Sequence, residues 1–158
     1  MRLTSQFQDG EVIPRRCTCE GQNQSPPLTW TDPPQQAQSF VLLCDDPDAP
    51  RGTWHHWAVY DIPADQRSLP AHHPRHGEGV RQALNDFHQP GYDGPCPPPG
   101  DRPHHYHFRL LALAVPQLRL PETASCAEVA VAAKPHVIAA AQLTGTYQRG
   151  RPGAARSS

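Results

Sequence analysis

The segment His104-His-Tyr-His-Phe-Arg-Leu-Leu-Ala-Leu-Ala-Val115 is an uninterrupted run rich in aromatic and aliphatic side chains. Successive side chains of a β-strand point to opposite faces of the sheet. By that alternation Tyr106, Phe108 and Leu110 share one face, and the residues between them lie on the other. The sequence therefore predicts a strand over residues 104–115 that buries one of its faces.

Two further segments have the length and the flanks of buried strands. Ser39-Phe-Val-Leu-Leu-Cys-Asp45 is a short apolar run, and Trp54-His-His-Trp-Ala-Val-Tyr-Asp-Ile62 stops at a proline. Short apolar or aromatic runs bounded by turn residues favour strands over helices. A last strand is expected around Leu143–Tyr147. The long proline- and glycine-rich connection from about Leu69 to Pro103 is expected to carry function.

Helix is expected only near the C-terminal end. Ser125-Cys-Ala-Glu128 has the spacing of a capping box, and the alanines after it favour helix until Pro135 removes an amide donor. We therefore expect two short helices that meet near Lys134-Pro135. Together these patterns predict a mostly β single domain over residues 1–149, followed by a flexible tail over residues 150–158.

Charge and hydropathy exclude some classes of partner. Lys and Arg number 14 against 15 for Asp and Glu, so the chain lacks the positive field of nucleic-acid binders. It has no signal-like apolar run at its start and no stretch of ~18 apolar residues, so we expect a cytoplasmic protein without a transmembrane segment. No cofactor is expected.

Five cysteines and ten histidines raise the questions of disulfides and metal. Because the cysteine count is odd and no signal is seen, free thiols are expected rather than disulfides, with Cys17 and Cys19 on the same face of a strand. The cysteine and histidine spacings match neither a C-x-x-C pair nor an H-E-x-x-H helix, so no metal site is expected.

Three segments concentrate polar and backbone-restricted residues. They are Asp46-Pro-Asp-Ala-Pro50, Trp54-His-His-Trp57, and Gly91-Tyr-Asp-Gly-Pro-Cys-Pro-Pro-Pro-Gly100, which leads into His104 and Tyr106. Prolines after Asp46 make a rigid corner that aims its carboxylate, and glycines allow close approach to a ligand. Taken singly, each segment has another interpretation: an ordinary turn, a solvent-facing histidine, or a polyproline recognition motif.

These segments, together with Ser25-Pro-Pro-Leu-Thr-Trp30, occur in the order and spacing of one known family. The chain resembles the phosphatidylethanolamine-binding proteins, also called Raf kinase inhibitor-like proteins, and particularly their compact bacterial and archaeal branch. Two positions depart from the family pattern: His105 stands where arginine is usual, and His88 where glycine is common.

The resemblance implies an antiparallel β-sandwich with a small anion pocket that holds phosphate esters or carboxylates. Carried over by position, the pocket residues are Asp46, His56, His104 and Tyr106, and His55 faces away. The walls would be Pro50, Trp54 and Pro98, and the rim the Gly94–Cys96 backbone. The two imidazoles and the phenol would donate to the anion, and Asp46 would favour protonated imidazoles.

Other functions stay open at the level of sequence. A hydrolytic enzyme could combine Asp46, His56 and His104 with Cys96 as nucleophile, although no oxyanion donors are identified. The resemblance also implies a role in regulating a kinase or a protease, and a homodimer.

Overall fold

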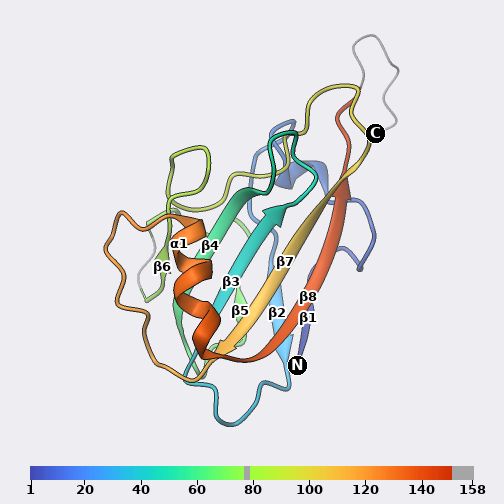
Figure 1. Cartoon of the computed structure of the whole chain (residues 1–158). Helices are drawn as coiled ribbons and strands as arrows, with labels where there is room; N and C mark the ends of the chain where they lie inside the picture. The colour runs from blue at the N-terminus through green and yellow to red at the C-terminus, as the bar shows by residue number, and fades with distance from the viewer. Residues whose placement is uncertain (77–78, 151–158) are drawn as a thin grey trace.

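The computed structural model describes residues 1–76 and 79–150, so nearly all of the predicted tail lies outside the described residues. It contains two antiparallel sheets (Figure 1). The larger sheet has the order β6-β4-β3-β7-β8, and the smaller has the order β1-β2-β5. Within the described part of the chain, no helix is long and apolar enough to span a membrane.

The strands of the larger sheet are β3 (Ser39–Asp46), β4 (Trp54–Pro63), β6 (Arg81–Gln82), β7 (His104–Leu113) and β8 (Val137–Tyr147). The smaller sheet consists of β1 (Arg2–Thr4), β2 (Leu28–Thr31) and β5 (Ser68–Leu69). Two single 3-10 turns, Arg15–Cys17 and Lys134–His136, and the helix α1 (Cys126–Ala133) complete the secondary structure. The predicted mostly β sandwich with a short C-terminal helix is confirmed.

The larger sheet is covered on both faces. Figure 1 shows α1 against one face and the small sheet behind the other. Along β3 the alternate residues Phe40 and Leu42 enter the core between the sheets, while Val41 and Leu43 pack with Val129 of α1. A strand buried on both faces needs apolar residues at every position, which explains the continuous apolar run.

The C-terminal region differs in part from its prediction. Ser125 and Glu128 form the expected capping box at the start of α1. The second helix, however, is only the 3-10 turn at Lys134–His136, and β8 begins at Val137 rather than near Leu143. Alanines 139–141 are extended because they pair with β7 residues 110–112, and this pairing outweighs their helical propensity.

Antiparallel pairing brings three strand ends to one edge of the large sheet. β3 ends at Asp46, which pairs with Trp54 at the start of β4, and β7 starts beside the same end of β3. The polar residues near these three ends are therefore neighbours, although as many as 58 positions separate them in the chain.

Candidate functional site: a pocket at the strand ends

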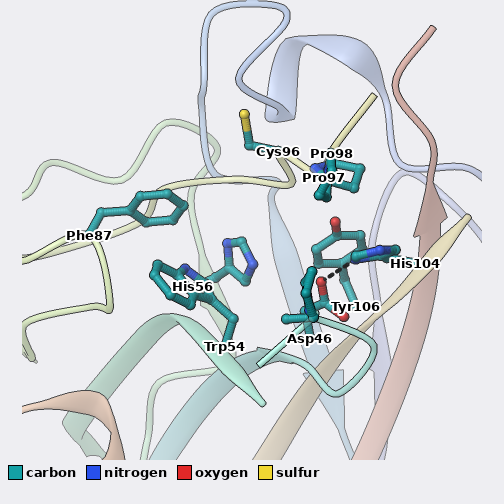
Figure 2. A pocket seen from close by; sticks show the side chains of 11 residues that line it. Asp46, Trp54, His56, Phe87, Cys96, Pro97, Pro98, His104 and Tyr106 are labelled. Atoms are coloured by element: carbon teal, nitrogen blue, oxygen red, sulfur yellow. Dashed lines mark hydrogen bonds and ion pairs between the residues drawn. The ribbon is translucent and has the colours of Figure 1, made fainter. Parts of the chain in front are cut away.

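A cavity of about 210 Å³ opens at this edge of the sheet (Figure 2). Eight of the nine residues predicted for the site line it, the exception being Gly94. The predicted convergence of Asp46, His56, His104 and Tyr106 is therefore present. Their role in binding a ligand stays a prediction.

Gly94 supports the rim from outside the cavity. Its amide donates to Asn23 Oδ1 at 2.7 Å, and a Cβ at this position would collide with the carbonyl of Cys17. The glycine thus allows the N-terminal loop to pack tightly behind the proline-rich segment.

The Tyr106 hydroxyl is the most exceptional polar group of the site. The side chain is fully buried, and its oxygen has no hydrogen-bond partner within the described structure. Figure 2 shows this oxygen pointing toward Pro97 and Pro98 across the cavity. Burial raises the pKa of the phenol, so it stays a neutral donor. Orphaned buried hydroxyls are costly and rare unless a ligand or water satisfies them.

Asp46 and His104 form a buried pair. The Nδ1 atom of His104 lies 2.7 Å from Asp46 Oδ2, and its Nε2 atom lies 3.1 Å from Asp101 Oδ2. Burial by itself would lower the pKa of His104, but the two carboxylates outweigh it and raise the pKa. Asp46 therefore favours a protonated His104, as expected. Both ring nitrogens are engaged by carboxylates, so a ligand meets no free nitrogen of His104.

His56 behaves differently from its predicted role. Its side chain is 3% exposed, and burial lowers its pKa in spite of a hydrogen bond to the Asp93 carbonyl and the nearby Asp46. Asp46 acts to raise the pKa of His56, as expected, but burial outweighs this effect. The pKa values of the two histidines are thus shifted in opposite directions.

Asp93 is an organising residue that the sequence did not reveal. Its carboxylate accepts from Asn23 at 2.8 Å, from Asn85 at 2.8 Å and from both terminal nitrogens of Arg75 at 2.8 and 3.1 Å. Nothing in the Gly91-Tyr-Asp-Gly segment marks Asp93 as a buried hydrogen-bond acceptor. Its partners come from three separate loop segments, which only the folded chain brings together.

His55 points away from the cavity, as expected for adjacent strand residues. Its Nδ1 atom lies 2.8 Å from Asp45 Oδ1, and Arg109 donates to the other oxygen of the same carboxylate at 2.9 Å. His105, at the position where arginine is usual, pairs with Asp48 at 2.8 Å near the surface. Neither histidine lines the pocket.

Phe87 is a wall residue that was not predicted. Its ring packs edge-on against Trp54 at 5.3 Å and tilted against His56 at 5.7 Å. With Pro50, Pro97 and Pro98 these rings make a mostly apolar collar around the polar floor. The Trp54 Nε1–H is a second buried donor without a partner among the described residues.

The prediction of free thiols is wrong for two of the five cysteines. Cys19 and Cys96 form a disulfide across 77 residues, which ties the N-terminal loop to the pocket rim. Cys17 and Cys19 lie in and after a 3-10 turn, not on a strand. Cys96 has no thiol to act as a nucleophile, and the expected cytoplasmic location loses one of its grounds.

No three metal-ligating side chains come together in residues 1–76 and 79–150. The pocket's polar groups comprise the Asp46–His104 pair, a His56 ring held by a main-chain carbonyl, and two buried donors without a partner among the described residues.

Comparison with known proteins agrees with the geometry. A sequence model of the family "Phosphatidylethanolamine-binding protein" matches residues 3–148. A UPF0098 protein of Aquifex aeolicus is 46% identical over 90% of this chain and 85% of its own length. One from Methanothermobacter thermautotrophicus is 45% identical over 93% and 97%, respectively.

Solved structures give the same answer. YbcL of Escherichia coli, described as a new member of the mammalian family, superposes with a TM-score of 0.88 at 35% identity, covering 94% of this chain and 98% of that one. A homologue from Chlamydia trachomatis gives 0.84 at 38%, covering 94% and 97%. The match over nearly the whole chain establishes the relationship: this chain belongs to the phosphatidylethanolamine-binding protein family.

Proposed function

We propose that the protein binds a small phosphate ester or carboxylate in this pocket and performs no catalysis on it. The Tyr106 hydroxyl is the observation that carries the proposal, because a buried donor without a partner inside a cavity is stabilised when a ligand oxygen accepts from it. The Trp54 indole offers a second such donor at the pocket wall.

The apolar collar supports a ligand that carries a short carbon group next to its polar head. Phe87, Trp54 and the prolines contact that group, while the polar floor receives the oxygens. A phospholipid headgroup and a phosphorylated small molecule share this chemistry. The fold likeness to a carboxypeptidase Y inhibitor has only 18% identity, so it carries no argument for protease inhibition.

The experiment is a calorimetric titration with phenyl phosphate, using Tyr106→Phe and the matched control Tyr60→Phe. Tyr60 is equally buried but packs in the cluster beneath α1. Loss of a hydrogen bond to a charged group costs about 1.5–3 kcal/mol, so Tyr106→Phe should weaken binding about 10- to 100-fold. The control should bind as the wild type does.

Stability separates this result from simple damage. The Tyr106 hydroxyl has no partner in the free protein, so its removal should leave the free energy of unfolding unchanged or slightly higher. Wild-type affinity in Tyr106→Phe would contradict the proposal, as would a failure of phenyl phosphate to bind the wild type.

A further inference from the structure

The tautomer of His56 is fixed by the main chain. Its Nδ1 atom lies 2.6 Å from the carbonyl oxygen of Asp93. A carbonyl can only accept, so Nδ1 must carry the hydrogen and donate it. The Asp93 amide returns a hydrogen bond to the His56 carbonyl at 3.3 Å, and the Asp93 carboxylate is held by Arg75, Asn23 and Asn85. The ring is therefore held in one orientation.

The second nitrogen, Nε2, remains for the cavity. Among the described residues nothing forms a hydrogen bond with it, and Figure 2 shows the ring reaching into the space in front of Tyr106. Burial between the rings of Phe87 and Tyr106 keeps the pKa of His56 below its ordinary value. The acidic groups that act against this are Asp46 and Asp45 on β3 and Asp86 in the loop, and they do not outweigh burial. At neutral pH Nε2 thus presents a lone pair.

Among the described residues, the rest of the cavity supplies donors but no free cation. The Tyr106 and Trp54 donors are unpaired. Both ring nitrogens of His104 are already engaged by carboxylates, Asp46 on one side and Asp101 on the other. A ligand therefore meets two neutral donors and one neutral acceptor.

Building on the proposed function, we propose that the pocket selects a phosphate monoester in its singly protonated form, with His56 Nε2 accepting the hydrogen of the P–OH group. The unprotonated oxygens accept from Tyr106 and Trp54. With a fully ionised phosphate, a lone pair of its oxygen would face the lone pair of Nε2 with no hydrogen between them, and the two would repel. A dianion in solution therefore takes up one proton from solvent when it binds. The second ionisation of such esters lies near pH 6, so about one tenth of the ligand is in the singly protonated, binding-competent form at pH 7.

The matched probes are phenyl phosphate and phenyl sulfate, which share shape and aromatic group but differ in the proton. We expect phenyl phosphate to bind at least about tenfold more tightly at pH 6.5, since the sulfate leaves Nε2 without a donor. Calorimetry in two buffers of different ionisation enthalpy should show uptake of close to one proton per phosphate bound at pH 7.5.

The ratio of the two affinities is the decisive quantity. Deprotonation of His104 at higher pH affects both probes and cancels in the ratio. A proton carried by the ligand makes the ratio of phosphate to sulfate affinity fall about tenfold per pH unit above pH 7. If both probes instead strengthen equally as the pH falls, the phosphate brings no additional proton into the site and the inference is overturned.

His56→Phe removes the acceptor and keeps a ring of similar shape. It should bring the affinity ratio close to one, whereas His107→Phe, on β7 outside the pocket, should keep the wild-type ratio. If His56→Phe does not fold, the pH series on the wild type still decides. Equal binding of both probes to the wild type defeats this inference alone, while binding of neither defeats the proposed function with it.

Discussion

At the scale of single residues, two histidines in one pocket are tuned in opposite directions. We predict by NMR titration a pKa for His104 above its ordinary value, since Asp46 and Asp101 outweigh burial, and a pKa for His56 below it, since burial prevails. Asp101→Ala should lower the pKa of His104 and leave that of His56 nearly unchanged. Asp65→Ala, at an exposed position after β4, is the control and should move neither. Two parallel titrations would contradict the assignment.

The polar residues of the pocket were predictable to different degrees. Strand parity predicts that His104 and Tyr106 share a face, and Asp46 follows an apolar run that ends in a proline corner, but the family resemblance was needed to assign all three to one pocket. The neutrality of His56 was not predictable, because it depends on how deeply the ring is buried and on a carbonyl 37 residues away. Asp101 was missed for a related reason: its contact depends on the path of the loop before β7.

At the scale of elements, the disulfide fixes the proline-rich rim to the N-terminal loop. Closing a loop of 77 residues removes chain entropy worth about 4 kcal/mol in the unfolded state, and observed effects are typically ~2–4 kcal/mol. We predict that the double variant Cys19→Ala with Cys96→Ala loses about that much free energy of unfolding, measured by urea denaturation. The variant Cys126→Ala, which removes a buried free thiol, is the comparison, because it keeps the disulfide and should still lose stability in reductant.

An equal response of the double variant and the wild type to dithiothreitol would count against this bond, since only the wild type has a disulfide to lose. The pairing could not be inferred from sequence. Five cysteines allow many pairings, and Cys19 and Cys96 lie in irregular segments whose approach is set by Gly94. The length of β8 could not be predicted from the sequence either, because its alanines adopt the conformation that the neighbouring strand β7 imposes.

At the scale of the whole molecule, acid stability should depend on Asp93. Burial would raise the pKa of Asp93, but its hydrogen bonds from Arg75, Asn85 and Asn23 lower it overall. The stabilisation is therefore present above the unfolded pKa of about 3.9 and is lost as the pH falls through the lower folded value. We predict that Asp93→Asn is about 1–3 kcal/mol less stable at pH 7 and loses less on acidification.

Urea denaturation of both proteins from pH 7 to pH 2 measures the difference. The free energy of unfolding of Asp93→Asn should fall less steeply with decreasing pH than that of the wild type. It should still fall, because the pKa values of Asp45 and Asp48 are also lowered by their histidine partners against the effect of burial. If the free energies of unfolding of the two proteins fall in parallel with pH, Asp93 does not contribute to acid stability. The homodimer implied by the family resemblance stays a prediction, which sedimentation velocity can test.

The covalent link between Cys19 and Cys96 also divides the chain topologically. β2 to β6 lie inside the closed ring, and β1, β7, α1 and β8 lie outside it. Arg51 is exposed within the ring, in the turn between β3 and β4. A trypsin cut at Arg51 adds the mass of one water but leaves the two pieces of the chain joined by the disulfide. The pieces should separate on a denaturing gel only after reduction. The wall of the pocket would thus survive a break in the very turn that supports Asp46, because strand pairing and the cross-link hold both pieces in register.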